Sequence, residues 1–194
     1  MYTPIPLCKQ VEQINPDLEF IKYFSPASSK VCLVRDHAGV QHYILKLADK
    51  RKHPIVPESL HLSRIDNILR EERVLKELSS LDGITHLVEA YHSDNHVAIL
   101  KEFQEGLPLD ESDSLYDYYV IRRTIENMHA QGLVRIDVKY DNIIKPVKPG
   151  DTKLPPKIVD LGSCIFYNEV SFREFDKFEK EDLAQLDFMF FRIL

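Results

Sequence analysis

The sequence has little cysteine and no long apolar run. Its 194 residues include three cysteines, Cys8, Cys32 and Cys164, which lie far apart and form no Cys-x-x-Cys pair. An odd number of dispersed cysteines indicates reduced thiols in the cytosol rather than a disulfide framework. No stretch approaches the roughly 18 apolar residues of a membrane span, and the amino terminus lacks the basic and apolar regions of a secretory signal. We therefore expect a soluble, cytoplasmic protein.

Basic residues are fewer than acidic residues. Twenty-five lysines and arginines face 31 acidic residues, so the formal net charge is −6. This balance disfavours nucleic acid and anionic membranes as partners. Apolar residues at 44% and charged residues at 29% are ordinary proportions for a globular protein. The length suits one domain or two small lobes.

The hydrophobic pattern predicts a strand-rich first half. Short apolar or alternating segments predict strands at 19–24, 30–35, 42–46, 87–91 and 96–103. The residues 36–39, Asp-His-Ala-Gly, have the composition of a hairpin turn. A helix is expected from Ser63 to Asp82, where apolar residues recur at helical spacing. Pro54 and Pro57 indicate a loop over 50–60.

Gly106 and Pro108 interrupt this pattern, and a mostly helical part follows. Helices are expected over 114–130 and from about Lys180 to the last residue, with a hairpin leading to a strand-like segment at 158–160. The sequence thus predicts an α+β fold in a single minimal domain, residues 1–194. Its strand-rich N-terminal lobe would be about 1–105 and its helical C-terminal lobe about 106–194.

One short segment carries the residue types that phosphoryl transfer needs. Asp137 is followed two residues later by Lys139 and five residues later by Asn142. A carboxylate can orient an attacking hydroxyl and accept its proton, an ammonium can offset phosphoryl charge, and an amide oxygen can help to hold Mg²⁺. Further along, Asp160 begins the sequence Asp-Leu-Gly. Asp160 is a candidate for the main Mg²⁺ ligand, since Mg²⁺ prefers carboxylate and phosphate oxygens.

These motifs resemble those of the protein kinases, over a stretch from about Glu19 to the last residue. The segment DVKYDN, 137–142, is similar to the kinase catalytic loop, and DLG, 160–162, is similar to the metal-binding Asp-Phe-Gly motif. Upstream, YILK, 43–46, resembles the strand whose lysine holds the α- and β-phosphates of ATP. Asp182 resembles the aspartate that anchors the catalytic loop.

The resemblance implies further partners for the nucleotide. Glu71 is assigned to the helix carboxylate that pairs with Lys46, and Glu72 is the alternative. Glu102, Phe103 and Gln104 match the hinge whose backbone meets the adenine. The residues implied at the nucleotide are therefore Lys46, Ser28, Ser29, Val31, Glu102, Phe103 and Gln104.

The chain also departs from the kinase pattern. Val31 fits the last valine of the glycine-rich loop, but the segment before it has no glycine, so serine hydroxyls and Lys30 would cover the phosphates. Ile136 replaces the arginine of His-Arg-Asp, which disfavours control by a phosphorylated activation loop. Lys101 occupies the position that gates the adenine pocket, and the helices that usually form the peptide platform are absent.

The resemblance predicts a bilobal, protein-kinase-like fold with a truncated C-terminal lobe and ATP and Mg²⁺ as cofactors. Lys46, held by Glu71, would position the phosphates. Asn142 and Asp160 would hold Mg²⁺. Asp137 would orient the acceptor hydroxyl, while Lys139 offsets the developing charge.

The acceptor is expected to be a serine or threonine of a protein, because Lys139 lies two residues after Asp137, as in the serine/threonine protein kinases. Without a peptide platform, the substrate would be recognised as a folded surface, or an activating partner would complete the site. Compact kinases of this kind resemble bacterial effectors and small viral kinases, so an effector would act in a host cytosol. The alternatives are a small-molecule or lipopolysaccharide-type kinase, an AMP-transferring enzyme and a nucleotide-binding pseudokinase.

Each element also has a purely structural interpretation. Lys46 could be an edge-strand charge, and Asp182 could be a helix N-cap. His129 is interpreted as a packed or capping residue, and Cys164 as a small buried hydrophobe. The order and spacing of the elements together favour the kinase interpretation.

Overall fold

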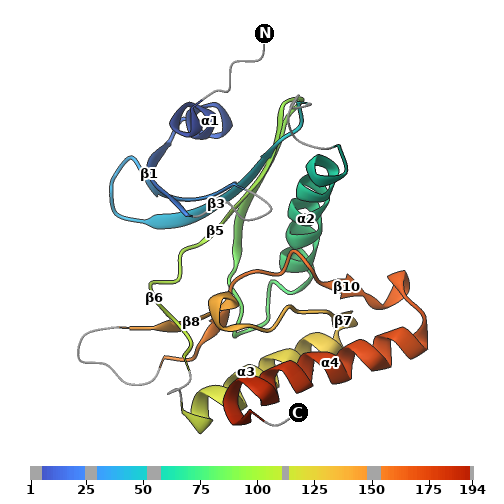
Figure 1. The fold of residues 1–194 in the computed structure, drawn as a ribbon. Coiled ribbons are helices and arrows are strands. Elements are labelled where there is room, and N and C mark those ends of the chain that lie inside the picture. Colours follow the sequence, from blue (N-terminus) through green and yellow to red (C-terminus); the bar gives the residue numbers. More distant parts are fainter. Residues whose placement is uncertain (1–5, 25–29, 52–57, 111–113, 148–153, 193–194) are drawn as a thin grey trace. The chain divides into compact units, whose positions relative to one another are not determined.

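The computed structural model of the protein describes residues 6–24, 30–51, 58–110, 114–147 and 154–192. The chain divides into two compact units, and each is described by itself. The first unit is Met1–Arg73 with His86–Phe103, and the second is Val74–Thr85 with Gln104–Leu194. Both combine helices with antiparallel strand pairs (Figure 1).

The first unit contains a five-stranded antiparallel sheet in the order β1-β2-β3-β5-β4. Its strands are β1 Leu18–Phe24, β2 Lys30–Asp36, β3 His42–Asp49, β4 Leu87–His92 and β5 His96–Glu102. The predicted strands are confirmed to within a few residues. The predicted hairpin is also present: Asp36 accepts hydrogen bonds from the backbone of Val40 and Gln41, and Gly39 adopts φ 68°, which glycine tolerates best.

Helix α1, Leu7–Ile14, packs against this sheet and was not predicted. Its Val11 is fully buried in a cluster with Leu45 and Leu47 of β3. Leu7 and Ile14 pack against the same cluster, so three apolar residues at positions i, i+4 and i+7 face the core. That spacing was the available signal, but a helix of eight residues depends on tertiary packing more than on its own propensity.

Helix α2, Glu58–Glu77, starts earlier than expected. The loop predicted over 50–60 is wrong for its last residues, since proline shortly before a helix is compatible with a helix start. The predicted apolar face is confirmed for Ile68 and Leu75, which are buried, whereas Leu69 is exposed. The boundary between the two units falls within this helix, after Arg73.

The second unit contains two long helices that lie side by side (Figure 1). Helix α3 is Leu115–Ala130, as predicted, and Ser114 and Asp117 form its capping box. Helix α4 is Phe172–Phe191, so the predicted start at Lys180 is wrong. A second capping box at Ser171 and Glu174 starts α4, which places Asp182 inside the helix and excludes it as an N-cap.

Short strands complete the second unit. β6 Gly106–Pro108, β8 Ile143–Pro146 and β9 Lys157–Ile158 form one sheet, and β7 Leu133–Val134 pairs with β10 Ile165–Phe166. The predicted hairpin is present as the antiparallel pair β8–β9, although residues 148–153 lie outside the described part. Two single 3₁₀ turns, Tyr140–Asn142 and Tyr167–Glu169, follow β7 and β10. These pairings fix both ends of the segment 135–142.

The three cysteines differ in their burial. Cys32 and Cys164 are buried, Cys8 is exposed, and none of the three is in a disulfide bond. Burial raises the pKa of the Cys32 thiol to about 12, so it stays protonated at neutral pH. Among the described residues, no helix has the length and apolar character that a membrane crossing requires.

His96 makes the first unit sensitive to acid. It begins β5 and is buried, and its Nε2 atom has no hydrogen-bond partner in the described part of the chain. Burial lowers the pKa of His96; Asp49 opposes this shift, and the charges of Arg51 and Lys30 add to it. The folded protein therefore resists protonating this ring, while the unfolded chain protonates it near the ordinary value of about 6.5.

We predict that His96 lowers the free energy of unfolding as the pH drops from about 7.5 to about 5.5, because the unfolded state then binds more protons at this residue. His96→Phe should weaken the pH dependence relative to the wild type. Urea unfolding at the two pH values measures the difference. Equal pH dependence in His96→Phe and the wild type would contradict the prediction.

Candidate active site

Lys46 and Glu71 lie together in the first unit. Lys46, on β3, donates a hydrogen bond from Nζ to Oε2 of Glu71, on α2, at 2.6 Å. Both side chains are buried, so each charge needs the other. The alternative carboxylate, Glu72, instead contacts His92 at 2.7 Å. The structure thus places Glu71 where the resemblance implies a lysine-pairing carboxylate.

A second lysine also binds Glu71, and sequence reasoning missed this contact. Lys101, on β5, donates to the other carboxylate oxygen, Oε1, and is itself buried. Ile44 lies opposite Lys101 and Lys46 lies opposite Ile99, so both lysines project from the same face of the sheet. The sequence marked Lys101 as unusual, but its pairing depends on this strand register.

The remaining residues implied at the nucleotide are distributed along the chain. Val31, on β2, lies directly opposite Lys46, on the same face of the sheet. Glu102 ends β5, and the ring of Phe103 lies 6.2 Å from that of His42. Gln104 begins the next part of the second unit. Two further predicted residues, Ser28 and Ser29, lie outside the described part.

Asp137, Lys139 and Asn142 are brought together in the second unit. Oδ2 of Asp137 accepts hydrogen bonds from Lys139 Nζ at 2.6 Å and from Asn142 Nδ2 at 3.0 Å. Asn142 also donates to the backbone oxygen of Asp137 at 3.0 Å, which fixes the amide. In the described residues Oδ1 of Asp137 receives no hydrogen bond, and the side chain is 46% exposed. A hydroxyl group can therefore reach this carboxylate and donate to it.

The backbone around Asp137 is held in an uncommon conformation. Arg135 has φ 59° and Asp137 has φ 56°, values that side chains other than glycine adopt rarely. Each costs on the order of 1 kcal/mol or more and persists only where neighbouring contacts hold it. Such strain is frequent at active sites, where it directs a side chain outward.

Asp182 supplies those contacts from α4. Its carboxylate accepts hydrogen bonds from the backbone N–H groups of Arg135 at 2.9 Å and Ile136 at 3.0 Å. His129, buried at the end of α3, lies 3.0 Å from the same carboxylate. The expected anchoring contact is therefore present, and His129 is a packed residue as interpreted. Asp182 is buried, so these bonds also satisfy its charge.

Asp160 lies next to Asn142, although the two are distant in sequence. The backbone N–H of Val159 donates to the carbonyl of Asn142 at 2.9 Å, and β8 pairs with β9 just beyond. Asp160 is half-buried, and one of its oxygens accepts a hydrogen bond from the Gly162 backbone at 3.2 Å. The strand–turn arrangement thus brings both predicted metal ligands onto neighbouring segments.

The predicted metal ligands, Asn142 and Asp160, both offer oxygen donors, which are the donors that Mg²⁺ prefers. No group of three or more His, Cys, Asp or Glu residues suited to a metal ion occurs among the described residues. Asn142 uses Nδ2 for Asp137, which leaves its Oδ1 as an oxygen donor. Mg²⁺ is commonly bound by one or two protein oxygens together with waters and substrate phosphates.

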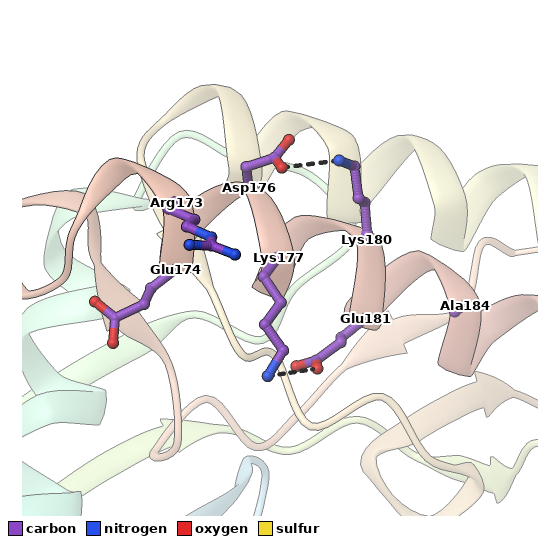
Figure 2. A pocket seen from close by; sticks show the side chains of 7 residues that line it. All are labelled: Arg173, Glu174, Asp176, Lys177, Lys180, Glu181 and Ala184. Atoms are coloured by element: carbon purple, nitrogen blue, oxygen red, sulfur yellow. Dashed lines mark hydrogen bonds and ion pairs between the residues drawn. The ribbon is translucent and has the colours of Figure 1, made fainter.

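A shallow charged hollow on α4 contains none of the predicted residues. It is lined by Arg173, Glu174, Asp176, Lys177, Lys180, Glu181 and Ala184. Figure 2 shows that its charges pair along the helix, with Lys180 on Asp176 at 2.8 Å and Lys177 on Glu181 at 3.4 Å. Exposed pairs at this spacing stabilise a helix slightly, so we interpret the hollow as a solvated helix face.

By sequence, the chain is similar to protein kinases, although no family model matches it. It is 24% identical to calcium-dependent protein kinase 12 of Oryza sativa subsp. japonica, 30% identical to ribosomal protein S6 kinase 2 alpha of Xenopus laevis and 24% identical to ovarian-specific serine/threonine-protein kinase Lok of Drosophila melanogaster. The matches cover 71%, 70% and 77% of this chain. They span only 26%, 18% and 33% of the relatives.

These relatives support a protein-kinase-like transferase. The mixed α/β structure with antiparallel sheets is compatible with a kinase-like fold. Within each unit, the residues that carry the sequence resemblance also contact one another: Lys46 with Glu71, and Asp137 with Lys139 and Asn142.

We predict that Glu71→Ala destabilises the first unit by about 3–5 kcal/mol, because it leaves two buried lysines without their shared carboxylate. Glu72→Ala is the matched control, since Glu72 is the next residue of the same helix but contacts a half-exposed histidine. Glu72→Ala should lower the free energy of unfolding clearly less than Glu71→Ala does. Denaturant unfolding of the two variants measures the difference, and equal losses would refute the assigned pairing.

We predict that Asp182→Ala costs about 2–4 kcal/mol and releases the loop 135–137, because two backbone N–H groups lose their acceptor. Asp176→Ala, on the exposed side of the same helix, should cost less than about 0.5 kcal/mol. Amide hydrogen exchange at Arg135 and Ile136 reports the release directly. Unchanged protection at these amides would contradict the anchoring role.

Proposed function

We propose that the protein transfers the γ-phosphoryl group of Mg-ATP to a serine or threonine hydroxyl of a protein substrate. The observation that carries this proposal is the cluster in which Lys139 and Asn142 bind one carboxylate oxygen of Asp137 and leave its other oxygen accessible. Its loop is held in a strained conformation by a buried carboxylate, as a positioned catalytic group requires. The similarity to protein kinases supports the same reaction class.

Each residue then has a chemical role. Asp137 orients the acceptor hydroxyl and accepts its proton through the carboxylate. Lys139, already hydrogen-bonded to Asp137, is placed to offset charge on the transferred phosphoryl group. Lys46 binds the non-transferred phosphates, and Glu71 fixes its direction.

The cofactor assignment follows from the oxygen donors. Asp160 and Asn142 would hold Mg²⁺, which supplies charge neutralisation at the β- and γ-phosphates. The hinge residues Glu102, Phe103 and Gln104 would meet the adenine, with Val31 beside Lys46. In this proposal the nucleotide-binding lysine belongs to the first unit and the transfer loop belongs to the second.

Two observations favour a protein as the acceptor. Lys139 lies two residues after Asp137, as in serine/threonine kinases, and Lok of Drosophila melanogaster is named a serine/threonine-protein kinase. The substrate is recognised as a folded surface or with the help of an activating partner. We propose that the reaction takes place in the cytoplasm, or in a host cytosol if the protein is an effector.

We predict that Asp137→Ala abolishes ATP turnover and leaves the dissociation constant for Mg-ATP nearly unchanged, because Asp137 acts on the acceptor rather than on the nucleotide. Asp141→Ala is the matched control, since Asp141 lies exposed in the 3₁₀ turn Tyr140–Asn142 that follows Asp137. ADP release and nucleotide titration measure the two quantities. Loss of both turnover and binding in Asp137→Ala, with the fold intact, would argue against this role.

A further inference from the structure

The hydroxyl group of Tyr140 attaches the loop 135–142 to the last turn of α4. Its Oη atom donates a hydrogen bond to the backbone carbonyl oxygen of Met189 at 2.6 Å. The last four carbonyl groups of an α-helix have no donor within the helix, and α4 ends at Phe191. The backbone N–H of Arg192 bonds the carbonyl of Phe188, and Tyr140 bonds the next carbonyl along. A side chain of the loop thus completes the end of this helix.

This bond is the second attachment of the loop to α4. Toward the start of the loop, Asp182 accepts hydrogen bonds from the backbone of Arg135 and Ile136. Met189 lies about two turns after Asp182, and both are buried on the same face of the helix. Asp137 lies between the two attachments, so one helix holds the loop on both sides of the candidate catalytic carboxylate.

Tyr140 also lies within the hydrogen-bonded network of Asp137. Lys139 precedes Tyr140 in the chain and Asn142 follows it, and the side chains of both donate to Oδ2 of Asp137. The backbone N–H of Asn142 donates to the carbonyl of Lys139 at 3.0 Å, which closes the 3₁₀ turn around Tyr140. The bond from Tyr140 to α4 therefore fixes the turn from which both side chains reach the Asp137 carboxylate.

We propose that Tyr140 is a positioning residue for phosphoryl transfer, because its bond to Met189 holds the turn that directs the Asp137 carboxylate. This inference rests on the proposed function, since it takes Asp137 as the group that orients the acceptor hydroxyl. A displacement of about 1 Å at a reacting group can lower the rate of a reaction strongly. Loss of the Tyr140 hydroxyl should therefore lower kcat.

Tyr140→Phe removes the hydroxyl group and keeps the aromatic ring, so it tests the bond to Met189 with little change in packing. The kcat for transfer of the γ-phosphate should fall by about tenfold, because the Asp137 carboxylate loses part of its fixed direction. The dissociation constant for Mg-ATP should stay nearly unchanged, because Tyr140 acts on the residue that orients the acceptor. This split between kcat and nucleotide binding is the signature of a positioning role.

Tyr118→Phe is the matched control. Tyr118, on α3, also binds α4 through its hydroxyl group, which donates to Asp187 at 2.7 Å and accepts from Arg122 at 2.7 Å. The control variant thus loses a partly buried hydrogen bond to the same helix, but one that does not involve the loop. Tyr118→Phe should keep the kcat of the wild type. An equal fall of kcat in both variants would show that α4 packing, and not the Tyr140 bond, is what matters.

The experiment measures the rate of γ-label transfer to protein in a cytosolic extract at saturating Mg-ATP, for the wild type and both variants. A titration with Mg-ATP and amide hydrogen exchange at Asn142 accompany it. The inference predicts a lower kcat and faster exchange at Asn142 in Tyr140→Phe alone. Unchanged exchange there would overturn it, because the turn would then be held without Tyr140.

The result also separates this inference from the proposed function. A wild-type kcat in Tyr140→Phe would show that the inference is wrong, while transfer by the wild type would leave the proposed function standing. If the wild type transfers no γ-phosphate, the proposed function and this inference fail together.

Discussion

The hydrogen bonds from the backbone of Arg135 and Ile136 to the carboxylate of Asp182 are the interaction on which the account of this protein depends. They hold the strained backbone around Arg135 and Asp137, both at positive φ, which directs Asp137 toward solvent while Ile136 is buried in the core. Without them the backbone would relax to ordinary dihedral angles and Asp137 would lose its fixed direction. A buried carboxylate on a long helix is a rigid support for such a loop, because its position is set by packing rather than by the loop itself.

Each unit contains a buried carboxylate that orders the groups around it. In the second unit, buried Asp182 organises backbone N–H groups; in the first, buried Glu71 organises the ammonium groups of Lys46 and Lys101. Both carboxylates are costly to bury and become tolerable only when every oxygen has a partner. The free-energy cost of burying these two carboxylates is difficult to explain by stability alone. It is typical of sites where charged groups must keep a defined geometry for binding or catalysis.

Local sequence predicted much of the fold, and long-range contacts determined the rest. The strands and the hairpin at 36–39 follow from alternation and turn composition, and the Lys46–Glu71 contact follows from the kinase resemblance. Helix α1 was missed because eight residues carry too little periodicity, and the start of α4 was missed because the capping box at Ser171 was not recognised. The Lys101–Glu71 contact depends on strand register, which no local pattern reveals. The positive φ angles at Arg135 and Asp137 run against the preference of their residue types and arise from contacts with Asp182.

The measurement that tests the central claim most directly compares two samples of Mg-ATP, one labelled in the γ-phosphate and one in the α-phosphate, with the purified protein in a cytosolic extract. The account predicts that the γ-label, and not the α-label, appears on a discrete protein band and on phosphoserine or phosphothreonine after hydrolysis. Transfer of the α-label would identify an AMP-transferring enzyme. Label on a small molecule, or no transfer of either label, would contradict the assignment of a protein kinase.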